Sequence, residues 1–106
     1  MQVIQRTLLT IITEQILESK LKDLVDQAGA EGYSITSPVH GKGKHGERSG
    51  PADIRDNIKM VLVIPKDIAE TILRTIEKEY GNTFSILAFM HDVDVVQWTP
   101  TFTATR

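Results

Sequence analysis

The centre of the chain reads IKMVLVIP from Ile58 to Pro65, a mostly apolar run that a proline closes. Its short length and β-branched content predict a buried strand over residues 58–64. Pro65 suits the first turn of a helix, where its missing N–H would have no partner in any case. The apolar residues that follow recur at helical spacing: Ile68, Ile72, Leu73 and Ile76. The stretch therefore predicts a strand that leads directly into an amphipathic helix, which Gly81 ends.

The start of the chain repeats this order of elements. Residues 6–12 are apolar and β-branched, which predicts a first strand. Thr13 suits the N-cap of a helix, and Glu14 places a negative charge in its first turn. The apolar positions of that helix are Ile16, Leu17, Leu21, Leu24, Val25 and Ala28. Gly29 then supplies a stop.

Two more strands complete the pattern. Residues 32–39 combine aromatic and β-branched side chains, and Pro38 places the end of this strand at an edge or a bulge. Residues 83–96 indicate a long last strand. The order strand, helix, strand, strand, helix, strand predicts an α+β, ferredoxin-like βαββαβ fold. In that fold an antiparallel sheet carries both helices on one face.

Both faces of the predicted sheet are apolar. On the central strand Met60, Leu62 and Ile64 point one way, while Val61 and Val63 point the other. Because the two helices cover only one face, the other needs a cover of its own. Burial at roughly 25 cal/mol per Å² would contribute several kcal/mol per subunit. We therefore expect a homo-oligomer, and the periodicity leaves two-fold and three-fold symmetry open.

Composition bounds the class of protein. A chain of 106 residues is predicted to form one domain, residues 1–106. Its net charge of -2 argues against a nucleic-acid partner, because such domains carry a marked basic excess. The absence of cysteine excludes disulfides and thiolate metal sites. No apolar run approaches the roughly 20 residues of a membrane span, so we expect a cytoplasmic protein without membrane insertion.

Residues 39–50 combine glycines with positive charge. Four glycines let backbone N–H groups converge, and the fixed cations Lys42, Lys44 and Arg48 stand beside them. This composition predicts a phosphate site. A solvated loop between two strands has much the same composition, so the alternative of a plain linker stays open at this point.

Three segments together resemble the PII signal-transduction superfamily. They are Gly32-Tyr33-Ser34, the segment Val39-His40-Gly41-Lys42-Gly43-Lys44, and the returning strand from Lys59 to Pro65. The likeness covers residues 5 to 96. It implies a homotrimer that binds an adenine nucleotide between subunits, with the phosphates at the glycine and lysine segment and the adenine near Ser34 and the Val63 backbone. The implied nucleotide-binding residues are Gly32, Ser34, Gly41, Gly43, Lys44 and Val63.

The chain departs from nitrogen-regulatory members of that superfamily at three places. The connection between Gly43 and Val63 is shorter and has no tyrosine, so no uridylylation switch is expected. Residues 81–84 replace the Gly-x-Gly-Lys phosphate loop, and residues 95–98 lack the arginine pair beyond the last strand. These features resemble the PII-like branch linked to bicarbonate transport and carboxysomes. That resemblance favours AMP, ADP or cyclic AMP over ATP, and a membrane transporter as the regulated partner.

The resemblance also implies roles for two segments without clear periodicity. Residues 41–57 correspond to a mobile T-loop that contacts the regulated partner. The partner-binding residues expected in it are His45, Glu47, Arg48, Asp53 and Arg55. Residues 97–106 form a C-terminal tail, which either folds onto a neighbouring subunit or frays.

The alternative is a trimer of the divalent-cation-tolerance kind that binds a metal or another small molecule. Its ligands would be His40, His45 and His91. The histidines lack tight metal-ligand spacing and there is no cysteine, so we expect no metal. Asp92 and Asp94 would share one face of a strand, but no nucleophile or base is placed beside them. We therefore expect a regulatory protein without enzymatic activity.

Overall fold

A computed structural model describes residues 1–39, 42–43, 46–47 and 56–98. The main elements are β1 (Gln2–Glu14), a 3₁₀ turn (Gln15–Leu17), α1 (Glu18–Gln27), β2 (Ser34–Val39), β5 (Asn57–Ile64), α2 (Lys66–Tyr80) and β6 (Ile86–Gln97). Two short strands, β3 (Lys42–Gly43) and β4 (Gly46–Glu47), pair with each other.

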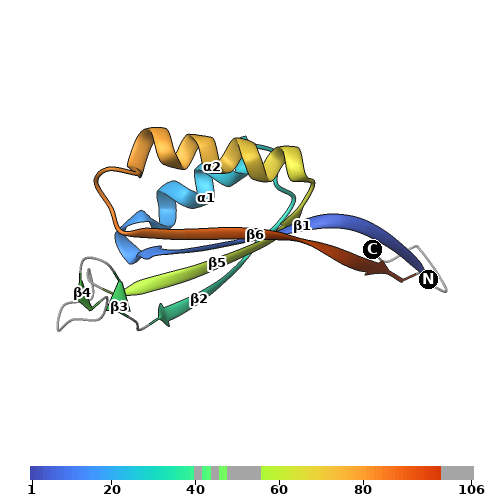
Figure 1. Cartoon of the computed structure of the whole chain (residues 1–106), viewed down its shortest axis with the longest axis horizontal. Coiled ribbons are helices and arrows are strands. Elements are labelled where there is room, and N and C mark those ends of the chain that lie inside the picture. The colour runs from blue at the N-terminus through green and yellow to red at the C-terminus, as the bar shows by residue number, and fades with distance from the viewer. Residues whose placement is uncertain (40–41, 44–45, 48–55, 99–106) are drawn as a thin grey trace.

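The main sheet has the strand order β2-β5-β1-β6, and every neighbouring pair is antiparallel. Both helices lie against one face of this sheet (Figure 1). The predicted ferredoxin-like βαββαβ arrangement is therefore confirmed.

The core lies between the helices and the sheet. Leu9 and Ile11 on β1 are fully buried, as are their neighbours Leu62 and Met60 on β5. The helices contribute Leu21, Leu24, Val25, Ala69, Ile72 and Ile76. The helical spacing of these residues and the two-residue period of the strands predicted which side chains meet here.

The predicted N-cap at Thr13 is wrong, because β1 continues through it to Glu14. Thr13 pairs with Ile58 on one side and Ile86 on the other, and its side chain is fully buried. Its hydroxyl donates a hydrogen bond of 2.9 Å to the backbone oxygen of Ser85. Pairing on both edges thus outweighs the capping preference of threonine, and the helix starts after a 3₁₀ turn.

The other boundaries shift for similar reasons. β1 and β6 pair along almost their whole length, so the first strand extends beyond residues 6–12 in both directions. β6 starts at Ile86 rather than at residue 83, because residues 81–84 form a turn. The ring of Phe84 in this turn packs edge-on against the ring of Tyr80 at the end of α2, with 6.0 Å between the ring centroids. β2 starts at Ser34 rather than at residue 32, and the last strand includes Gln97.

Gly29 has the one positive φ, 98°, in the part of the chain that the structure describes. We expect Gly29→Ala to destabilise the fold by about 1–2 kcal/mol, because an L side chain is strained in that region. Gly32→Ala is the matched control, since a Cβ there meets nothing within 4 Å. Thermal unfolding should show a lowered midpoint for the first variant alone. Equal midpoints for the two variants would contradict the assigned backbone strain.

Candidate functional site

The strand register defines the face of the sheet that the helices leave uncovered, called the open face below. Leu9 and Ile11 point into the core, so the residues between and beside them point the other way. The open face consists of Arg6, Leu8, Thr10, Ile12 and Glu14 on β1, Val63, Val61 and Lys59 on β5, His91, Phe89 and Leu87 on β6, and Ser34 and Thr36 on β2.

The part of the open face that β1, β6 and Val63 of β5 form is mostly apolar and accessible. Leu87 and Phe89 are 49% and 46% exposed, and Val63 is 47% exposed. Large apolar side chains at this exposure, gathered on one face, are typical of a surface that binds another protein, a membrane or a ligand. The predicted apolar character of the second face is thus confirmed.

The β2 side of the open face is polar. Ser34 lies opposite Val61, and Thr36 lies opposite Lys59, which also pairs with Ile12. Both hydroxyl residues and Lys59 are exposed. Thr36 and Lys59 are not among the site residues that the sequence predicts. The available signal was a lysine that interrupts the apolar run 58–64 at a position that points away from the helices.

The structure brings two of the predicted nucleotide contacts, Ser34 and Val63, to one end of the β2–β5 pair. Ser34 pairs with Val61, and Val63 lies two residues further along β5. Gly32 precedes Ser34 by two residues and lies in the connection before β2, outside the paired residues. Gly43 belongs to β3, beyond the opposite end of β2. Gly41 and Lys44 lie outside the described residues.

The predicted partner-binding residues fall mainly outside the described part of the chain. Glu47 is in β4, where it pairs with Lys42 of β3. His45, Arg48, Asp53 and Arg55 are not among the described residues. Residue 57, the predicted end of the loop, is the first residue of β5. The segment 41–57 therefore contains a short hairpin that the sequence did not predict.

Residues at and directly after the end of β1 form hydrogen bonds with the last residue before β5 and with the turn before β6. The backbone N–H of Gln15 donates to the oxygen of Asp56 at 2.8 Å. One residue earlier, Oε2 of Glu14 accepts a hydrogen bond of 2.8 Å from the N–H of Ser85. The carboxylate thus satisfies a backbone donor of the turn, a contact of the stronger, charge-assisted kind. Sequence reasoning missed it because its partners are 71 residues apart.

The charge on the open face is positive among the described residues. Arg6 and Lys59 lie on it, as the register with β5 and β6 shows. In the described ranges its one acidic residue is Glu14, whose carboxylate accepts from Ser85. Asp92 and Asp94 lie on the reverse side, where Gln5 Nε2 donates to Asp94 Oδ1. If a partner subunit covered this face, Arg6 and Lys59 would be removed from water, and an anionic ligand could neutralise their charge.

The alternative metal site gains no support from the described residues. Within residues 1–39, 42–43, 46–47 and 56–98, no group of three or more metal-ligating side chains is gathered. His91 lies on the open face and Asp92 on the reverse side. His40 and His45 lie outside the described residues. No helix in the described ranges is long and apolar enough to cross a membrane.

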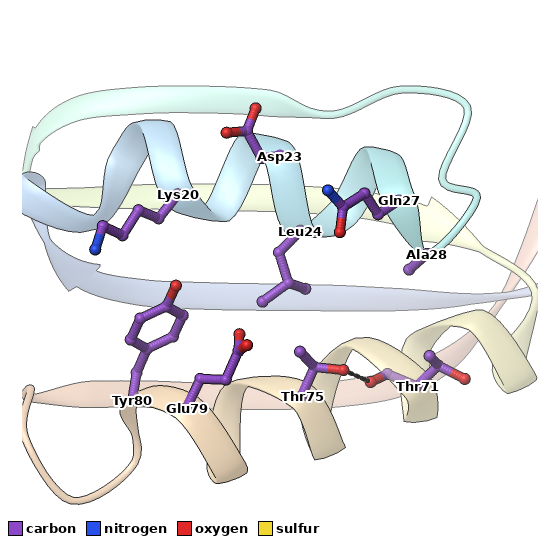
Figure 2. A pocket seen from close by; sticks show the side chains of 9 residues that line it. All are labelled: Lys20, Asp23, Leu24, Gln27, Ala28, Thr71, Thr75, Glu79 and Tyr80. Atoms are coloured by element: carbon purple, nitrogen blue, oxygen red, sulfur yellow. Dashed lines mark hydrogen bonds between the residues drawn. The ribbon is translucent and has the colours of Figure 1, made fainter.

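A groove of about 370 Å³ lies between α1 and α2, on the helix side of the molecule (Figure 2). Leu24 projects between the two helices, while Lys20, Asp23 and Glu79 line the groove with charge. Thr75 donates a hydrogen bond of 2.9 Å to the backbone oxygen of Thr71. None of the predicted site residues lines this groove, so it is separate from the candidate site.

Comparison with known proteins gave consistent matches. The family model described as nitrogen regulatory protein P-II matches residues 6–99. A PII-like signalling protein from Thermus thermophilus is 33% identical, with a TM-score of 0.78, over 91% of this chain and 94% of that one. CPII from Thiomonas intermedia, a nitrogen regulatory PII-like protein bound to ADP, AMP and bicarbonate, is 26% identical. Its TM-score is 0.79, over 91% of this chain and 100% of that one.

Proposed function

The chain belongs to the nitrogen regulatory protein P-II family, and from this we propose that it is a nucleotide-responsive regulatory protein. It acts as a homotrimer and has no catalytic activity of its own. An adenine nucleotide binds between subunits, and the bound nucleotide determines which partner surface the protein presents.

The apolar part of the open face supports the trimer. Val63, Leu87 and Phe89 are each about half exposed in a single chain. If another subunit covers these side chains together with Leu8 and Ile12, their apolar area is removed from water. At roughly 25 cal/mol per Å² this burial contributes several kcal/mol per subunit to the free energy of assembly. Because the two helices occupy the other face, a second copy of the chain is the cover that the fold itself supplies.

One observation carries the nucleotide proposal, the position of Ser34 and Val63 at one end of the open face, with Gly32 two residues before Ser34. Gly32 exposes backbone, Ser34 offers a hydroxyl, and the Val63 backbone is the proposed contact for the adenine edge. Gly41, Gly43 and Lys44 are proposed to hold the phosphates. ADP and AMP bound to CPII support this ligand class.

Short phosphate chains fit best. The turn at residues 81–84 offers no lysine, and residues 95–98 offer no cation. Fewer positive charges near the phosphates favour AMP, ADP or cyclic AMP over ATP. The bicarbonate in the CPII structure supports a small anion as a second effector here.

The segment 41–57 is proposed to bind the regulated partner through His45, Glu47, Arg48, Asp53 and Arg55. The expected partner is a membrane transporter, approached from the cytoplasm. The hydrogen bond between Gln15 and Asp56 fixes the end of the segment 41–57 to the sheet. The conformation of the segment between its two ends is proposed to depend on the nucleotide bound at residues 41–44.

Isothermal titration with AMP, ADP, ATP and cyclic AMP, each with and without bicarbonate, tests the proposal. We expect micromolar binding of at least one adenine nucleotide, with one site per subunit and ATP the weakest. GMP controls for recognition of the base. Absence of heat with every adenine nucleotide, together with a melting shift on Zn²⁺, would overturn the proposal in favour of a metal-binding trimer.

A further inference from the structure

The two ends of the described chain form a ribbon that leaves the body of the protein. Gln2–Arg6 of β1 pairs with Val93–Gln97 of β6, whereas the pairing of β1 with β5 stops at Thr7 and Ile64. Figure 1 shows this ribbon extending beyond both helices. We call these two segments the arm.

The arm has two different faces. Ile4 lies opposite Val95, and Arg6 lies opposite Val93. This face continues the open face, because Leu8 follows Arg6 with the same orientation on β1. The reverse face carries Asp92 and the hydrogen-bonded pair of Gln5 and Asp94, along with Val3 and Val96. The apolar face of the arm is therefore an extension of the surface already argued to lie between subunits.

An isolated two-stranded ribbon is only marginally stable in water. Among the described residues neither a third strand nor a helix covers the arm, yet both of its strands are regular and pair without a shift in register. Val95, Val93 and Ile4 are already half-buried in a single chain, and a flat apolar surface against them would complete their burial.

We infer that the arm of each subunit packs its apolar face, Ile4, Val93 and Val95, against a neighbouring copy of the chain. This inference rests on the trimer of the proposed function and adds a contact to it. Continuity with the open face selects a second copy as the occupant, because the face that carries Leu8 and Phe89 continues past His91 and Arg6 onto the arm in one unbroken register. The family match starts at residue 6, so Ile4 of the contact lies on strand residues that precede the match.

The arm leaves the sheet at the end where the candidate nucleotide contacts lie. Thr7 pairs with Ile64 and Leu8 pairs with Val63, so the base of the arm adjoins Val63. Packing of the arm therefore also holds this end of the cleft between subunits in place.

Val95→Asp and Val96→Asp form a matched pair of tests, because both put the same residue into neighbouring positions of one strand, on opposite faces. Sedimentation velocity over a dilution series measures trimer dissociation. We expect Val95→Asp to raise the dissociation midpoint by about tenfold or more, since burying a carboxylate at an apolar contact between subunits costs more than a factor of ten. Val96→Asp should stay within about twofold of the wild type. Equal midpoints for both variants, in a wild type that is a trimer, overturn the inference.

Amide hydrogen exchange of the wild-type trimer gives a second test that needs no variant. Residues 2–6 and 93–97 should exchange as slowly as the sheet residues 8–12, because a covered ribbon opens only with the assembly. Fast exchange confined to the arm overturns the inference, even if Val95→Asp fails to fold. A wild type that sediments as a monomer instead removes the trimer of the proposed function, so the two failures are distinguishable.

Discussion

Phe89→Asp should yield a folded monomer that no longer binds nucleotide. Phe89 points away from the core and is 46% exposed in a single chain, so a carboxylate is tolerated there before assembly. At a subunit contact the same carboxylate would be buried opposite Thr10 without a cation beside it in the register. The cost is at least about 3 kcal/mol per subunit, and three subunits lose it together.

Sedimentation velocity and circular dichroism check this expectation on one sample. The helical signal should stay at the wild-type level while the sedimentation coefficient falls to that of one chain. Ile16→Asp is the control, because Ile16 is an exposed apolar residue outside the open face, 58% accessible. A trimeric Phe89→Asp variant would show that the subunits do not meet at this part of the open face.

Lys44→Ala should weaken nucleotide binding by roughly 1.5 to 3 kcal/mol, the loss of one charge-assisted hydrogen bond to a phosphate. This corresponds to a dissociation constant about tenfold to a hundredfold higher. The trimer should persist, because the residues argued to form the subunit contact lie on the open face of the main sheet. Titration calorimetry measures the affinity, and sedimentation measures the assembly.

Lys78→Ala is the matched control for charge, because Lys78 is an exposed lysine in the last turn of α2. It removes the same net charge without touching the candidate site, so its affinity should equal that of the wild type. Equal affinities for Lys44→Ala and wild type would move the phosphate contacts away from the glycine and lysine segment.

The sequence predicted the fold where the apolar period is unambiguous. Met60, Leu62 and Ile64 alternate with Val61 and Val63, and the structure places the two sets on opposite faces as expected. Thr13 shows where this reasoning ends. Its capping preference is local, whereas its pairing with Ile58 and Ile86 depends on residues far along the chain. The length of β1 escaped prediction for the same reason, since only the partner strand β6 determines it.

The candidate site was predictable only in part. The resemblance selected Ser34 and Val63, and the register brings them to the same end of one strand pair. Lys59 and Arg6 were not selected, because the sequence does not show that two cations 53 positions apart share a face. The bond between Glu14 and Ser85 was equally invisible, since it joins a strand end to a turn through tertiary structure.

The unbroken pairing of β6 limits which insertions and deletions the strand can accept. Along Ile86–Gln97 the strand presents Leu87, Phe89, Val93 and Val95 to one side and Asp92 and Asp94 to the other. Insertion of a single residue at its start would exchange the two sides, putting both carboxylates on the open face and Phe89 toward the helices. Insertion of two residues would restore the alternation. Natural length variation within this strand should therefore occur in steps of two, whereas the turn at residues 81–84 tolerates single steps.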